Sequence, residues 1–152
     1  MKDAKIQIEF TTHCLANSSA NDGKKDCFPR DTSTNEIIFQ QSWWYSAFTK
    51  AIEITKIKGI KPSDVCIDLM IKATTDLYKR KYGENNFRVH EAIFPGSQIT
   101  INAIVADHVT ESTLTTILSK MGTYIGLSPY GHKLGYGKFK LIKVTIEPSV
   151  GE

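Results

Sequence analysis

The sequence has 152 residues, with a hydrophobic fraction of 41% and a charged fraction of 23%, as is usual for a globular protein with its own core. The formal net charge of +3 permits an anionic partner without requiring one, and no apolar run is long enough to span a bilayer. We therefore expect one domain over residues 1–152, in the cytoplasm and without a membrane partner. Three cysteines without a Cys-x-x-Cys spacing predict free thiols in a reducing compartment.

The N-terminal part of the chain predicts a strand, a long polar loop and a helix. Residues 5–11 alternate apolar and polar side chains, which is typical of a half-buried strand. Residues 16–35 are polar and should form an exposed loop. A helix is predicted over residues 42–56, with Ser42 as its cap.

The middle of the chain alternates apolar and polar residues from 65 to 78 without a break, which predicts one long strand rather than a helix. A basic run follows, and residues 88–94 predict the next strand. After the Pro95-Gly96 turn, residues 98–105 predict a strand whose inward side chains are Ile99, Ile101, Ala103 and Val105. Thr110 or Ser112 can cap a second helix that extends to about Met121.

Residues 122–139 contain half of the chain's ten glycines and precede a last alternating strand over residues 138–146. No acid occurs between Glu111 and Glu147, whereas lysines and aromatic residues do. A glycine-rich loop of this composition could cradle phosphates. The alternative is a long turn before the last strand, with its lysines in water, and the residue chemistry alone fits this second reading somewhat better.

The expected order is strand, helix, strand, strand, helix, strand. That order defines an α+β, ferredoxin-like βαββαβ fold with an antiparallel sheet, which RNA-recognition modules share. Two insertions are expected: a loop after the first strand, and a β-hairpin around residues 79–94 between core strands.

Three stretches resemble the CRISPR-associated RAMP superfamily: DCFPRDTSTNEIIFQQSWWYSAFTKA, VHEAIFPGSQITINAIV and MGTYIGLSPYGHKLGYGKFKLIKV. The first resembles the acid and Arg-Asp pair that precede a short strand and a helix in that family, although its Gly-Ser-Ser signature is absent here. The third resembles the C-terminal glycine-rich loop and last strand. The resemblance implies a small relative of the backbone subunits of CRISPR effector complexes, encoded for example by a phage or mobile element.

This interpretation implies a non-catalytic module that binds single-stranded RNA or ssDNA. Basic side chains would contact phosphates, and tyrosines would stack on bases. The expected nucleic-acid-binding residues are Arg30, Lys79, Arg80, Lys81, Gly126, Tyr130, His132, Lys133, Gly135, Tyr136, Gly137 and Lys138.

Two alternatives come from other functional classes. The first is an assembly subunit that contacts copies of itself or CRISPR effector subunits, as an anti-CRISPR-like mimic would. Trp43, Trp44 and the loop over residues 16–35 would form the contact, although core packing of both tryptophans is the simpler expectation.

The second alternative is a metal-independent endoribonuclease. The family resemblance implies Asp26 as the catalytic candidate in the loop after the first strand, and His13 or His132 as acid or base. Because these groups are isolated in the sequence, and Asp26 is expected to be solvated, we favour no catalytic residue. We also expect no metal and no cofactor, since the adjacent His13 and Cys14 have poor ligand spacing.

Overall fold

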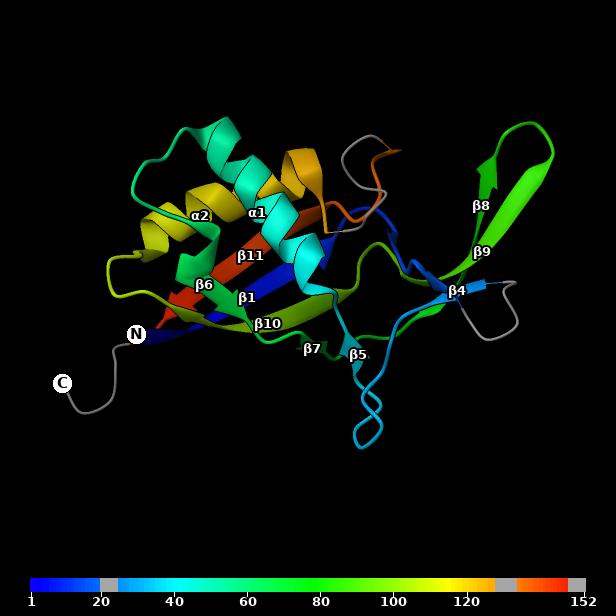
Figure 1. Ribbon diagram of the computed structural model, residues 1–152, viewed down its shortest axis with the longest axis horizontal. Coiled ribbons are helices and arrows are strands. Elements are labelled where there is room, and N and C mark those ends of the chain that lie inside the picture. Colours follow the sequence, from blue (N-terminus) through cyan, green and yellow to red (C-terminus); the bar gives the residue numbers. More distant parts are fainter. Residues whose placement is uncertain (20–24, 128–133, 148–152) are drawn as a thin grey trace.

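The computed structural model describes residues 1–19, 25–127 and 134–147. Its main layer is an antiparallel sheet with the strand order β11-β1-β10-β6 (Figure 1). This order is that of a ferredoxin-like βαββαβ unit, so the predicted fold class is confirmed. The core elements are β1 (Lys2–Phe10), α1 (Gln41–Thr55), β6 (Val65–Ile67), β10 (Gln98–Val105), α2 (Glu111–Lys120) and β11 (Phe139–Ile146).

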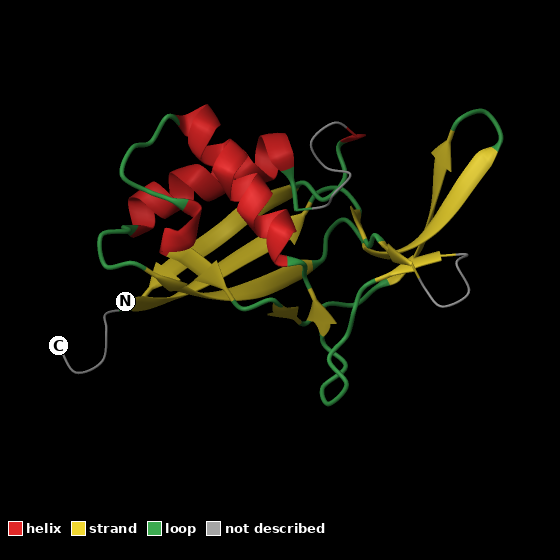
Figure 2. Ribbon diagram, viewed as in Figure 1, coloured by secondary structure: helices red, strands yellow, loops and turns green. Residues whose placement is uncertain are grey.

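Both helices cover one face of this sheet (Figure 2). Strand β10 follows the predicted alternation along its whole length, with its odd-numbered side chains buried under the helices. Strand β1 does the same with Ile6, Ile8 and Phe10. The opposite face of the sheet carries the exposed, mainly polar side chains that alternate with these core residues.

The two helices begin differently. Thr110 caps α2 as expected, because its hydroxyl accepts a hydrogen bond from the Thr113 amide. The prediction that Ser42 caps α1 is wrong: Gln40 occupies the cap position and makes no side-chain capping bond. Among the described residues, no helix is both long and apolar enough to cross a membrane.

A second sheet is built from the two insertions and extends to one end of the molecule (Figure 1). Its central strand is β9 (Asn86–Ile93), which forms an antiparallel hairpin with β8 (Asp76–Tyr82). The other edge of β9 pairs with segments that follow β1: β2 (Cys14–Leu15) and, in parallel, β4 (Lys25–Cys27), which in turn pairs with β3 (Ser18–Ser19). The described part of the loop predicted after the first strand therefore pairs with the predicted hairpin through β4.

The prediction of one strand over residues 65–78 is wrong. The chain instead forms the short 3-10 turn η1 (Pro62–Asp64), β6, β7 (Met70–Ile71) and β8, each strand with a different partner. Strand β7 pairs with β5 (Ile37–Ile38) outside the main sheet. The Asp68 carboxylate accepts a hydrogen bond from the Met70 amide, which forms a local turn. Strand β6 ends at this turn, although apolar and polar residues continue to alternate in the sequence.

After α2 the chain widens into the π-helical turn η2 (Met121–Ile125), which packs closely against the start of β11. A Cβ at Gly122 would lie 2.2 Å from the Phe139 carbonyl oxygen, and one at Gly126 would lie 2.7 Å from the Tyr136 carbonyl oxygen. Only glycine permits so close an approach of two backbones. These two glycines therefore serve internal packing.

Candidate nucleic-acid interface

The β8–β9 hairpin presents two faces of different chemistry, because successive side chains of a strand point to opposite sides. Cross-strand pairs place Tyr78, Arg80, Tyr82, Asn86 and Arg88 on one side, which we call the arginine face. Leu77, Lys79, Lys81 and Phe87 lie on the other side, which we call the lysine face.

The lysine face exposes cationic and apolar groups together. Lys79 Nζ lies 4.3 Å from the centre of the Phe87 ring, within the range of a cation–π contact. Phe87 is 49% exposed and Leu77 54% exposed, so this face offers apolar surface beside its lysines. The predicted phosphate contacts Lys79 and Lys81 are exposed on this face.

The arginine face is anchored by a buried polar network at its root. Arg88 donates two hydrogen bonds to the Asp26 carboxylate, from Nη2 at 2.7 Å and from Nε at 3.2 Å. Arg80 donates from Nε to His90 Nε2 at 3.1 Å and also lies 5.6 Å from the Tyr82 ring centre. This network ties β8 and β9 to β4.

His90 at the centre of this network is fully buried and neutral. Its Nδ1–H donates to the Ala16 carbonyl oxygen at 2.7 Å, which leaves Nε2 free to accept from Arg80. Burial lowers the pKa of His90 below its ordinary value, since the charged form is disfavoured away from water. The same nitrogen Nδ1 lies 3.3 Å from Asp26 Oδ2.

Asp26 was expected to be a solvated loop acid, and this expectation is wrong. Its side chain is only 8% exposed, because β4 places it beside β9 in the second sheet. The hydrogen bonds from Arg88 are the main cause that lowers the pKa of the Asp26 carboxyl. The carboxylate therefore joins two structural elements, and both of its oxygens are engaged.

Arg30, another predicted phosphate contact, is also engaged within the fold. Its guanidinium forms an ion pair with Glu91 and donates to Thr75 Oγ1 at 3.2 Å and to the Asn35 carbonyl at 3.0 Å. The Glu91 carboxylate in addition accepts the Phe28 amide at 2.8 Å. Arg30 thus holds the end of β4 against β9.

An aromatic junction, formed by His13, Tyr78, Phe94 and Tyr136, connects the arginine face with the end of the glycine-rich loop. The His13 ring centre lies 4.3 Å from that of Tyr78 and 4.5 Å from that of Phe94. The Tyr78 and Tyr136 hydroxyls lie 3.3 Å apart. Burial and this contact raise the pKa of Tyr136 to about 12, so its phenol is neutral.

His13 was a candidate acid or base. Partial burial lowers its pKa, and its ring is packed between two aromatic side chains rather than beside a carboxylate. Within the described residues, the candidates Asp26 and His13 therefore have separate structural roles, and no contact between them is found.

A hollow of ≈ 390 Å³ lies between η2 and the first residues of β11. We call it the lysine hollow. Lys138 and Lys140 provide its cations, and Thr11, Ser119 and Thr123 provide hydroxyl groups. Of these residues, the expected nucleic-acid-binding set includes Lys138, and the fold adds Lys140 from β11, Ser119 from α2, Thr123 from η2 and Thr11 from just after β1. Hydroxyl and ammonium groups are suited to an anionic group.

The remaining predicted residues divide into two groups. Gly126, Gly135 and Gly137 all have positive φ, and Gly137 donates its amide to the His13 carbonyl oxygen at 2.7 Å. These contacts support the turn interpretation for this part of the loop. Tyr130, His132 and Lys133 lie outside the described residues.

Trp43 and Trp44 are buried, so the prediction that they supply an interaction surface is wrong, and the simpler expectation of core packing agrees with the structure. Their exposed fractions are 8% and 4%. Trp43 packs against Phe28 and Phe39, and Trp44 donates from Nε1 to the Val65 carbonyl oxygen at 3.3 Å. The two rings therefore extend the apolar face of α1 over β6 and over the insertion that contains Phe28.

The fold and the surface together define a ferredoxin-like module with a basic, aromatic hairpin. No protein-family model matches the sequence, and a search of curated proteins finds no match. In structure, the chain is similar to a chain of the cryo-EM structure of the Type III-B Cmr-beta bound to cognate target RNA, with a TM-score of 0.58 and 16% identity. The match covers 95% of the present chain and 60% of the other. This likeness supports the ferredoxin-like fold.

Proposed function

We propose that this protein binds single-stranded RNA, without cleaving it, as a RAMP-like module of a CRISPR-associated assembly. The observation that carries the proposal is the chemistry of the projecting hairpin. It combines exposed lysines, aromatic rings and arginines. Through Tyr78 it contacts Tyr136 of the aromatic junction, which precedes Lys138 of the lysine hollow by two residues. Such a combination is typical of surfaces that bind single strands, because cations contact phosphates and aromatic faces stack on bases.

The open face of the main sheet is a poor alternative path for RNA. RNA-recognition modules stack bases on aromatic residues of that face. The central exposed positions here are Gln7 on β1 and Thr100 on β10, which lie opposite each other, with Lys143 beyond Gln7 on β11. Since no aromatic side chain occupies these positions, we expect RNA to follow the hairpin.

Binding without cleavage fits the roles of the two described catalytic candidates. Asp26 already accepts hydrogen bonds from Arg88, and His13 is packed in the aromatic junction. A general acid or base has to reach the reacting group with its titrating atom free. We therefore expect no cleavage of RNA by the isolated protein, with or without Mg²⁺.

The test is a titration of short fluorescein-labelled polyuridine, followed by fluorescence anisotropy at low and at raised salt. The double variant Lys79→Ala/Lys81→Ala should bind at least about tenfold more weakly at low salt, since each lost phosphate contact reduces affinity and salt dependence. The matched control Lys58→Ala/Lys61→Ala removes the same charge from exposed positions beyond α1, at the other end of the molecule (Figure 1).

The proposal fails if the parent does not bind RNA at low salt, or if both double variants lose affinity equally. Equal loss would show that net charge alone drives binding. A parallel titration with polydeoxythymidine tests the ligand class. Tighter binding of polydeoxythymidine than of polyuridine would show that ssDNA, and not RNA, is the preferred ligand.

A further inference from the structure

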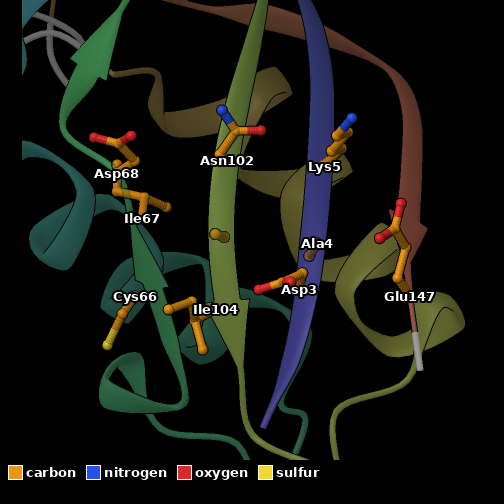
Figure 3. A pocket seen from close by; sticks show the side chains of 10 residues that line it. Asp3, Ala4, Lys5, Cys66, Ile67, Asp68, Asn102, Ile104 and Glu147 are labelled. Atoms are coloured by element: carbon orange, nitrogen blue, oxygen red, sulfur yellow. The ribbon is translucent and has the colours of Figure 1, made fainter. Parts of the chain in front are cut away.

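A hollow of ≈ 500 Å³ lies on the open face of the main sheet, on the side away from the helices (Figure 3). It crosses the N-terminal half of β1 and the ends of the neighbouring strands, far from the hairpin. We call it the acidic groove. Its lining includes Asp3, Lys5, Cys66, Asp68, Ile104 and Glu147.

The strand register arranges these side chains in rows across the sheet. Ile104 lies opposite both Asp3 on β1 and Cys66 on β6. On the other side of Asp3, the Glu147 amide donates to the Asp3 carbonyl oxygen at 2.8 Å. One row therefore runs from Ile104 to the carboxylates of Asp3 and Glu147 on adjacent backbones. Asp68, just after β6, adds a third acid at the other edge of the groove.

This arrangement gathers negative charge at one place, where the Asp68 carboxylate accepts a hydrogen bond from the Met70 amide. Like charges on directly neighbouring strands are destabilising, yet none of the ion pairs between described residues involves Asp3, Asp68 or Glu147. Lys5 is the single cation in the lining, whereas the whole chain is basic. Ile104, in the middle of the groove, is 47% exposed.

Two kinds of occupant do not fit. Among the described residues, no group of three or more His, Cys, Asp or Glu side chains could hold a metal ion. RNA does not fit either, because carboxylates repel phosphates and the groove offers no aromatic ring for stacking.

We propose that the acidic groove binds an extended, basic segment of a partner protein, in which an aliphatic residue is flanked by Arg or Lys. The aliphatic side chain would cover Ile104, one basic side chain would approach Asp3 and Glu147, and the other would approach Asp68. Strands lie about 4.8 Å apart, so the groove from β6 to β11 spans about 14 Å, which four or five extended residues cover. Every second side chain of such a segment faces the sheet. This inference does not depend on the RNA-binding proposal.

The experiment uses labelled peptides on the whole protein, because the natural segment is unidentified. The probe GRSLSRG places Arg, Leu and Arg on one side, and GRSSSRG and GESLSEG remove the aliphatic residue or reverse the charge. We expect GRSLSRG to bind more tightly than either. The variant Asp3→Asn/Glu147→Gln should weaken GRSLSRG about fivefold, as expected for partly exposed charge pairs.

The matched control is Glu53→Gln/Glu84→Gln, which removes two exposed acids elsewhere and should leave the peptide affinity unchanged. Thermal melting of each variant checks its fold. RNA affinity should be the same in the groove variant as in the parent, which separates this proposal from the previous one.

Three results would overturn the proposal: equal affinity for GRSLSRG and GESLSEG, equal weakening by the control, or no binding of GRSLSRG at low salt. Light scattering adds a fourth. If the parent self-associates and Asp3→Asn/Glu147→Gln abolishes this, the occupant is a second copy of the chain and not a segment of another protein.

Discussion

Replacement of Asp26 by alanine tests whether this acid is structural or catalytic. The Asp26 side chain is 8% exposed and is held by Arg88 across 62 positions of the sequence. The substitution leaves Arg88 without its counter-charge inside the second sheet. It also removes the carboxylate next to the neutral ring of His90.

The magnitude follows from the burial of the pair. Removing one partner of a buried ion pair costs about 3–5 kcal/mol. Because the Arg88 side chain is 25% exposed, part of its charge can be rehydrated, and we expect a loss of about 2–3 kcal/mol in the free energy of unfolding. For a chain of this length, that loss lowers Tm by roughly 5–10 °C.

Urea denaturation, followed by the fluorescence of the buried Trp43 and Trp44, measures this loss. The control Asp31→Ala removes a loop acid that caps a local turn through Ser33 and Thr34 and should shift the midpoint less. The pair Asp26→Leu/Arg88→Met should recover part of the stability, since it removes both charges together. An unchanged midpoint for Asp26→Ala, together with loss of an RNA-cleaving activity of the parent, would refute the structural role and make Asp26 catalytic.

Three further predictions concern other parts of the fold. Because burial lowers the pKa of His90, the unfolded chain binds a proton near pH 6.5 that the folded protein does not bind. The free energy of unfolding should therefore be highest above about pH 6.5 and fall below it. The decrease in Tm from about pH 7.5 to about pH 5.5 should be smaller in His90→Gln than in the parent, and an equal decrease would contradict this. Gly122→Ala should lower the free energy of unfolding by about 2–3 kcal/mol in urea denaturation, because its Cβ would meet the Phe139 carbonyl oxygen, whereas Ser119→Ala should be nearly neutral; equal midpoints would refute the packing role. Tyr136→Phe should retain RNA affinity and Tyr136→Ala should lose about 1–3 kcal/mol of it, and equal affinities would exclude stacking on this ring.

The elements that the sequence predicted well are those whose pattern and boundaries are local. Strand β10 was expected over its observed range, because alternation and the preceding Pro-Gly turn determine it without further context. The α2 cap at Thr110 was found for the same reason. The strand order of the main sheet then follows from the ferredoxin-like element sequence.

The incorrect predictions concern segments whose local pattern does not determine which other segment they pair with. Residues 65–78 alternate throughout, but alternation does not say which strand is the partner, and three different partners divide the segment. Composition likewise described the Asp26 loop as polar, while its burial depends on an arginine far along the chain.

The candidate nucleic-acid interface could be predicted only in part, because it too depends on which segments pair. The basic run Lys79–Lys81 is visible in the sequence, but its division into two faces requires knowledge that β8 pairs with β9. The lysine hollow is assembled from β1, α2, η2 and β11, and no sequence spacing could have indicated it. Gly122 and Gly126 belong in sequence to the glycine-rich loop, but close backbone packing explains both.

The central claim is that RNA follows the hairpin and the aromatic junction, and the most direct test is photo-crosslinking of thiouridine-containing single-stranded RNA followed by mass spectrometry. We expect crosslinks to the tyrosines of the arginine face and of the junction, Tyr78, Tyr82 and Tyr136, or to Phe87 on the lysine face. Crosslinks confined to the open face of the main sheet or to Tyr45 on α1, which is 53% exposed, would contradict it.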